Sequence, residues 1–535
     1  MENTLGIILT ALFILGCFLL HKRHRQQQYF KKRGIATPPF DLLFGHLLTM
    51  WSAKSSADQL KEWTRKYGKI YGIFAGSSPI YIVSDVNFLE QVFIKQFSSF
   101  YSHQTDFSEH AVEKSKRGLL IASGNQWRRQ KQIIGPIIST GIKQMSPLFD
   151  KCVDEMIHSL ESLNSNIQEE FNIYPLYKKT FWNMACGSFG IDVVVEENAT
   201  NKLFNEFEKF FMTDTKSYPL LRASELFPSF GTIFLYLFEM YNEIGRLFRD
   251  IIWPKAWGPI WEGYALYRVK HQLFSLFNKR WRIPHNEHNI QGQKQDFLTM
   301  MSATLTFDSI EDENNVAGGQ SHQPRPINAH EIIDNAFLFM GAQYAGNAAV
   351  MACCSYILAT NCDIQNKLVS EINQFASSAD QDKLNGDIVS QMPYLDMFIR
   401  EILRMYPLST LGIDRQCMRD TIVNGIHVSK GSVVQADVYS IHYDPDIWGP
   451  EDPEIFCPER HLTENRHPLA LLFFGAGPRM CPGVRLALIT AKVVLVRLLQ
   501  HYNIVACESQ EKTLGLEEKV IHLPTESWVK LVPRK

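Results

Sequence analysis

Apolar and polar residues alternate with a helical period over most of this chain. Apolar positions recur three and four residues apart near 88–97, 145–163 and 203–213, which predicts amphipathic helices. Residues 331–361 contain no proline, and about thirty residues is enough for a helix that crosses a whole domain. A further amphipathic helix is predicted over residues 484–500.

Short strands are predicted at two places. Residues 70–83 alternate on either side of a Gly-Ser-Ser-Pro turn, which is typical of a hairpin. Residues 421–438 hold short apolar runs around Asn424-Gly425 and Lys430-Gly431. The fold class predicted from these patterns is therefore mainly α with small β-sheets.

The amino terminus carries an apolar run, Leu5 to Leu20, that contains no charged residue. Basic residues follow this run, and Glu2 is the only charged residue before it. This arrangement favours a retained transmembrane helix over a cleaved signal peptide. The positive-inside rule then places the rest of the chain in the cytosol. We predict a membrane anchor at 1–20, a basic and proline-containing linker at 21–50, and a catalytic domain at 51–535.

A second apolar segment, residues 226–262, is rich in Phe, Leu, Ile, Trp and Pro. It would suit a membrane surface, the roof of an apolar cavity, or two ordinary core helices. Membrane lipids are an expected partner of this chain because of the predicted anchor at 1–20.

Composition excludes several classes of function. The 535 residues are 45% hydrophobic and 21% charged, as in globular proteins, and the formal net charge of -2 gives no reason to expect nucleic acid. Ten cysteines without a CxxC pair indicate neither a disulfide framework nor a structural zinc cluster. The aromatic share of 12% suits a large core or an apolar ligand cavity.

The segment Phe474-Gly-Ala-Gly-Pro-Arg-Met-Cys-Pro-Gly483 carries the candidate chemistry. Its glycines and prolines prevent regular structure, and Cys481 lies just before the helix predicted from 484. Backbone N–H groups and the positive end of that helix would favour the thiolate. Arg479 adds a charge that suits a carboxylate. A lone thiolate in an apolar loop can be a nucleophile or an axial ligand of haem iron, although an isolated Cys is more often an inert buried residue.

At these residues the sequence resembles the cytochrome P-450 family, whose haem-binding loop reads F-x-x-G-x-R-x-C-x-G. The resemblance implies a cytochrome P-450 fold, haem b as cofactor, Cys481 as the ligand of its iron, and Phe474 in the cofactor-binding loop. Glu401-Ile-Leu-Arg404 and Arg460 match the Glu-Arg-Arg network that holds this loop in the family. These three residues are expected to be structural.

The resemblance also implies residues that bind the haem propionates. Trp127-Arg-Arg-Gln-Lys131 is similar to the family's W-x-x-x-R, with Lys in the place of Arg. Lys supplies the charge without the two-pronged geometry of a guanidinium. Arg415 matches a further propionate ligand, and Arg479 completes the set.

The long helix departs from the family pattern where oxygen would be activated. Met340-Gly-Ala-Gln-Tyr-Ala345 stands in the place of A/G-G-x-D/E-T-T, so Gly341, Gln343 and Tyr344 become the candidate catalytic residues. Gly341 would let the helix pass close to haem. Gln343 cannot exchange a proton near neutral pH, and the hydroxyl of Tyr344 has a reference pKa near 10. Proton delivery is therefore expected to depend on Tyr344 or on water.

Two functions follow from the resemblance. The first is a single-pass membrane monooxygenase of the endoplasmic reticulum that oxidises a lipophilic small molecule, with electrons from a separate NADPH-dependent reductase. The second is an endoperoxide or hydroperoxide isomerase that needs neither oxygen nor reductase. Pro393-Tyr-Leu-Asp-Met397 and Leu403-Arg-Met-Tyr-Pro407 are similar to thromboxane synthase, which works in this second way. Kinship with drug-oxidising relatives would explain the same motifs.

Overall fold

The computed structural model describes isolated positions before residue 28 and then most of the chain to residue 534. The gaps after residue 28 are at 42–43, 104–117, 163–168, 214–217, 228–230, 248–264, 282–295, 304–326, 379–384, 410–412, 463–464 and 511–513. Most of the predicted anchor at 1–20 and much of the apolar segment at 226–262 thus lie outside the described residues.

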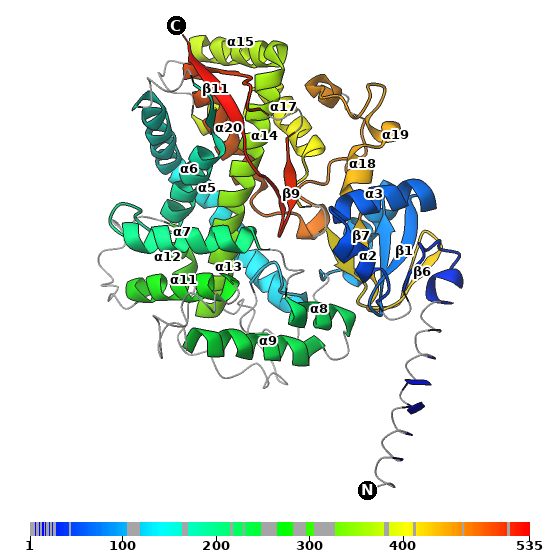
Figure 1. The fold of residues 1–535 in the computed structure, drawn as a ribbon. Helices are drawn as coiled ribbons and strands as arrows, with labels where there is room; N and C mark the ends of the chain where they lie inside the picture. Colours follow the sequence, from blue (N-terminus) through cyan, green and yellow to red (C-terminus); the bar gives the residue numbers. More distant parts are fainter. Residues whose placement is uncertain are drawn as a thin grey trace.

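Helices form most of the structure, as the apolar periodicity predicts (Figure 1). Those in the first half of the chain are α2 (Leu47–Ser52), α3 (Ser56–Tyr67), α4 (Val86–Glu90), α5 (Gly124–Ser162), α6 (Tyr174–Ser188), α7 (Glu197–Phe211), α8 (Pro219–Leu226) and α9 (Gly231–Arg246). Those in the second half are α11 (Ala265–Trp281), α12 (Phe297–Ser302), α13 (Ala329–Gly341), α14 (Asn347–Thr360), α15 (Cys362–Ser378), α16 (Gly386–Val389), α17 (Pro393–Met405), α18 (Val438–His442), α19 (Pro445–Trp448) and α20 (Val484–His501).

The strands are short and form small sheets. The four-stranded sheet lies at one side of the helices, whereas β11 lies beside α14 (Figure 1). The largest sheet has the order β1-β2-β7-β4, and its β1 and β2 are the hairpin predicted at 70–83. Strands β5 and β6 pair around Asn424, whose φ of 47° suits a tight turn. The bounds are β1 (Ile70–Ala75), β2 (Ser78–Val83), β3 (Phe171–Asn172), β4 (Asp414–Gln416), β5 (Thr421–Val423), β6 (Ile426–Val428), β7 (Val433–Ala436), β8 (Tyr502–Val505), β9 (Leu516–Glu518), β10 (His522–Pro524) and β11 (Trp528–Pro533).

Part of the predicted linker at 21–50 packs onto the four-stranded sheet. The ring of Phe30 is buried there, and it occupies the space beside Gly72, where a Cβ would lie 2.4 Å from the ring. Residue 36 also bridges to β1. Part of the segment that charge and proline content predict to be a linker therefore packs as part of the folded domain.

The long helix predicted at 331–361 is present, but it is interrupted. Helices α13 and α14 are joined by η8 (Ala342–Gly346), a turn of π-helix, and the three segments run through the middle of the helical part (Figure 1). Within the described part of the chain, Ala329–Thr360 is the one helix long and apolar enough to cross a membrane, and most of it is buried among its neighbours. It is therefore the central helix of the core.

Two apolar cores meet at the loop that carries Cys481. The larger surrounds α13 and α14, and α20 contributes Leu486 to it. The smaller lies on the four-stranded sheet and includes Leu472 and Ala476. Because the loop takes part in both cores, its position depends on how the sheet and the helices pack together.

The start of the central helix provides a direct test of its stability. Asn328 accepts a hydrogen bond from the N–H of Glu331 at 2.9 Å, and the Glu331 carboxylate accepts one from the N–H of Asn328 at 3.1 Å. We expect Asn328→Ala to lower the free energy of unfolding by about 1 kcal/mol in urea denaturation, because the side-chain acceptor is lost. Asn328→Ser keeps an acceptor and should recover most of this loss; equal losses in both variants would contradict the capping role.

Candidate functional site

The loop from Phe474 to Gly483 folds back on itself and presents the thiol of Cys481. The N–H of Cys481 donates to the carbonyl of Phe474 at 3.0 Å. Gly477 has a φ of +71°, and a Cβ at this position would lie 2.1 Å from the carbonyl oxygen of Phe93. Only glycine allows this close approach. Helix α20 begins at Val484, so the thiol lies just before its first turn.

The surroundings of Cys481 do not by themselves favour the thiolate. Burial raises the pKa of the thiol, and a hydrogen bond from the N–H of Gly483 only partly opposes this. The helix end is in the predicted place, just after the thiol. A coordinated metal ion at this position would supply a positive charge that favours the thiolate.

A group of cations surrounds Trp127 beside the Cys481 loop. The guanidinium of Arg479 lies 4.5 Å from the centre of the Trp127 ring, and the Lys131 ammonium lies 5.1 Å from it. Lys131 also donates to the carbonyl of Pro478, within the loop. Arg479 donates to the carbonyl of Tyr101 at 3.0 Å. The structure thus brings together three of the residues predicted to bind a carboxylate-bearing cofactor.

Arg415 lies in β4 and reaches the same loop. It donates to the carbonyl of Ala476 at 3.1 Å and lies 4.6 Å from the ring centre of Phe93. Its Nε is buried without a partner among the described residues. Burial lowers the pKa of Arg415 to about 10, whereas the charge of Asp414 opposes this shift.

The guanidinium groups of buried Arg415 and half-buried Arg479 repel one another. Burial and then the charge of Arg415 lower the pKa of Arg479 to about 9. His103 joins this group, since its Nδ1 lies 3.0 Å from the Asp414 carboxylate and 3.4 Å from Nη1 of Arg415. An anionic group bound here would relieve the repulsion and satisfy the free Nε of Arg415. Haem would supply this charge through its two propionates if Cys481 held its iron.

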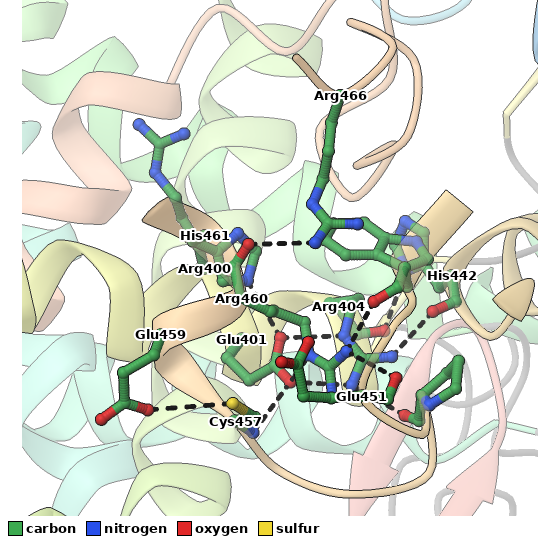
Figure 2. A network of polar contacts seen from close by, with 12 residues as sticks. Arg400, Glu401, Arg404, His442, Glu451, Cys457, Glu459, Arg460, His461 and Arg466 are labelled. Carbon is green, nitrogen blue, oxygen red and sulfur yellow. Dashed lines mark hydrogen bonds and ion pairs between the residues drawn. The ribbon is translucent and has the colours of Figure 1, made fainter. Parts of the chain in front are cut away.

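The predicted Glu-Arg-Arg network is formed, and all three side chains are fully buried (Figure 2). Glu401 and Arg404 lie one turn apart on α17, and Arg404 donates to both carboxylate oxygens at 2.8 Å. Arg460, in η9 (Pro458–Leu462), donates to the same carboxylate at 2.8 Å. The remaining N–H groups of the two arginines bind backbone carbonyls, those of His442, Trp448, Glu451, Asp452, Pro453 and Ile455.

His461 is a member of this network that the sequence did not indicate. It stands where the family usually has Phe, and its Nε2 donates to Glu401 at 2.9 Å. Burial alone would raise the pKa of Glu401, but hydrogen bonds from Arg404 and His461 hold it at about 2. The only sequence signal was the adjacency of His461 to Arg460.

The predicted catalytic residues of the central helix face its neighbours. A Cβ on Gly341 would lie 3.1 Å from Phe211 and 3.2 Å from Phe207, both on α7. The Tyr344 ring packs edge-on against Trp182 on α6, with ring centres 5.7 Å apart. The close packing at Gly341 thus involves α7, and Tyr344 belongs to the aromatic core on this side. Gln343 is also buried, and its Nε2 has no partner in the described structure.

Ala342 and Gly346 form the accessible face of the same helix. Ala342 is exposed and Gly346 is half-buried, whereas the residues between them are buried. A Cβ on Gly346 would meet no atom within 4 Å. Gly346 thus borders an open space, and Ala342 lies one turn before it. The hydrogen bond from Asn347 to Thr490 at 3.1 Å fixes this part of the helix against α20. Sequence reasoning missed both residues, because the π-helical turn changes which positions share a face.

Comparison with known proteins now identifies the family. The sequence model of the family Cytochrome P450 matches residues 36–529. The chain belongs to the cytochrome P450 family. It is 28% identical to cytochrome P450 CYP13A4 of Caenorhabditis elegans, with 94% of each chain covered. It is 29% identical to Cytochrome P450 3A2 of Rattus norvegicus, with 99% of this chain and 96% of that one covered. These relatives support the superfamily, and not thromboxane synthase specifically.

The depressed pKa of Glu401 makes stability depend on pH. Its carboxylate has a usual pKa of 4.5 and a pKa of about 2 in the fold, so its contribution is complete above pH 4.5 and is lost as the pH falls towards 2. We expect on the order of 3 kcal/mol of the free energy of unfolding to disappear over this range. Glu401→Gln should remove this part of the pH dependence in denaturant titrations.

A neighbouring carboxylate provides the control for this experiment. Glu459 is partly exposed and pairs with Lys367 at the surface. Glu459→Gln should change the pH dependence far less, because an exposed pair is screened by water. Equal effects of the two substitutions would show that burial of Glu401 is not the cause.

Proposed function

We propose that this cytochrome P450 is a haem-thiolate monooxygenase that oxidises a lipophilic small molecule. The observation that carries the proposal is the convergence of Cys481 with the cations Arg415, Arg479 and Lys131 on one loop. A buried thiol without a counter-charge, and cations that outnumber the neighbouring Asp414 carboxylate, are complementary to one group that bears both a metal cation and carboxylates. The open face at Ala342 and Gly346 would provide an apolar wall for the substrate.

The side chains of this chain would hold the cofactor as follows. Cys481 would ligate the iron, with Phe474 in the loop that supports it. Trp127, Lys131, Arg415 and Arg479 would bind the propionates. Haem, when bound, supplies the iron that binds oxygen, and a thiolate ligand donates electron density that favours O–O cleavage.

The proposed partners follow from the same assignment. A separate NADPH-dependent reductase would deliver electrons. Residues 1–20 would anchor the protein in the endoplasmic reticulum membrane with the catalytic domain in the cytosol, as the basic residues behind the apolar run favour. Helix α9 supports contact with membrane lipids, because it exposes several apolar side chains. These are Ile233, Tyr236, Leu237, Met240, Tyr241 and Ile244.

The open face of the central helix favours a second candidate function. Ala342 and Gly346 carry neither an acid nor a hydroxyl, and the packing of Tyr344 against α6 and α7 gives no support for a role as proton donor. Cleavage of dioxygen to water requires delivered protons, whereas rearrangement of an existing O–O bond does not. An endoperoxide or hydroperoxide isomerase would therefore suit this face.

The two functions differ in what they require. A monooxygenase forms product only with NADPH, reductase and oxygen; an isomerase converts an endoperoxide in the absence of all three. We expect oxygen-dependent oxidation within a panel of lipids. Anaerobic conversion of the endoperoxide at an undiminished rate, together with no oxidation of the panel, would replace the first function by the second.

Cys481→Ser tests the assignment of the ligand in the same preparation. The reduced carbon-monoxide complex of the wild type should show the red-shifted Soret band of thiolate ligation, and the Ser variant should lose both this band and turnover. Retention of the band and of turnover in the variant would refute a haem-thiolate site at Cys481.

We also predict that Gly346, and not Tyr344, is the position that limits proton delivery. Gly346→Thr would place a hydroxyl in the open space, and we expect more product per NADPH consumed because the hydroxyl can relay a proton. Tyr344→Phe should leave this ratio unchanged, because it removes a buried hydroxyl that has no partner within the described structure. A reduced ratio in Tyr344→Phe, with no gain in Gly346→Thr, would restore Tyr344 as the proton donor.

A further inference from the structure

The imidazole of His442 is fully buried between the Glu401 network and the Cys481 loop. It lies at the end of α18, and its Nδ1 donates to the carbonyl of Arg404 at 2.9 Å. Its Nε2 accepts a hydrogen bond from the N–H of Leu472 at 2.9 Å. Both ring nitrogens are therefore hydrogen-bonded, Nδ1 to the Glu401 network and Nε2 to the backbone that precedes the Cys481 loop.

These contacts define the protonation state of the ring. Because Nε2 accepts a backbone N–H, the imidazole is neutral and carries its proton on Nδ1. Burial, which lowers the pKa of His442 to about 3, stabilises the same form. Arg404 also donates from Nη1 to the carbonyl of His442 at 2.7 Å, so the two residues are bonded in both directions (Figure 2).

The contact with Leu472 continues to the thiol. The carbonyl of Leu472 accepts the N–H of Gly475 at 2.8 Å, which closes the turn that precedes the loop. Phe474 lies within this turn, and its carbonyl accepts the N–H of Cys481 at 3.0 Å. A short series of hydrogen bonds thus runs from the Glu401 carboxylate through Arg404 and His442 to the backbone of Cys481.

We infer that His442 is a positioning residue for Cys481, which transmits the fixed place of the Glu401–Arg404 pair to the loop that presents the thiol. The inference rests on the proposed role of Cys481 as iron ligand. Core packing alone would require only a side chain of similar volume. Positioning requires an acceptor directed at Leu472.

Substitution of His442 by Gln or by Asn tests the two ring nitrogens separately. Gln places an amide near Nε2, so His442→Gln can keep an acceptor for Leu472. Asn is shorter and places its amide near Nδ1, so His442→Asn can keep the donor to Arg404 but not the contact with Leu472. The Soret bands of the reduced carbon-monoxide complex measure how much haem is ligated by thiolate and how much is not. We expect the ratio of haem without thiolate ligation to haem with it to be about fivefold larger in His442→Asn than in His442→Gln. This is the factor for one lost neutral hydrogen bond.

A second readout does not depend on haem. The backbone amide of Leu472 should exchange with deuterium faster in His442→Asn than in His442→Gln, in preparations with and without the cofactor. Tyr443→Phe is the matched control, because it removes a hydrogen bond from the adjacent residue to the carbonyl of Met405 and should leave both readouts unchanged.

The outcomes distinguish this inference from the proposed function. If the Asn and Gln variants match each other in both readouts, the contact with Leu472 does not position the thiol and the inference fails. If Tyr443→Phe shifts the bands as far as His442→Asn, the effect is general destabilisation and the inference also fails. Absence of the thiolate Soret band in the wild type would instead refute the proposed function.

Discussion

The buried carboxylate of Glu401 is the constraint on which the rest of this site depends. A charge without water is costly, and here it is stabilised by Arg404, Arg460, His461 and the N–H of Cys457. Removing one partner of such a group typically costs 3–5 kcal/mol, because the other charge stays buried. The network therefore has one favourable arrangement, and the backbone carbonyls bound to its arginines are fixed with it.

This arrangement places segments that are far apart in the sequence. Arg460 binds four carbonyls between residues 448 and 455, and Arg404 binds that of His442. Irregular backbone of this kind has no helical or sheet partners, so the guanidinium groups take their place. The Cys481 loop lies next to this structure and between the two apolar cores. The geometry of the loop is thus set by the buried charges of the Glu401 network and by packing against the two apolar cores.

Sequence reasoning succeeded where the chemistry is local. The hairpin at 70–83 and the irregular loop around Gly477 each follow from a few adjacent residues, whereas the buried pair of Glu401 and Arg404 follows from the resemblance to the cytochrome P450 family. It failed where the outcome depends on tertiary packing. The π-helical turn at 342–346 changes the face on which Tyr344 lies, and no periodicity of apolar residues encodes it, because Gln343, Tyr344 and Ala345 are all buried although they differ in polarity. Phe30 is buried only because Gly72 leaves room for its ring.

The same turn bears on the reaction with oxygen that we propose for this site. A continuous α-helix and a helix with one π-turn present different side chains to the same space. The residue type at an aligned position is therefore not enough to assign a catalytic role to that residue. Here the bulky Tyr344 fills the aromatic core against α6 and α7, and the small Ala342 and Gly346 are left at the open face. Space for substrate is gained, and side-chain proton donors are absent from these two positions. At these two positions a proton would have to come from another side chain, from water or from the substrate.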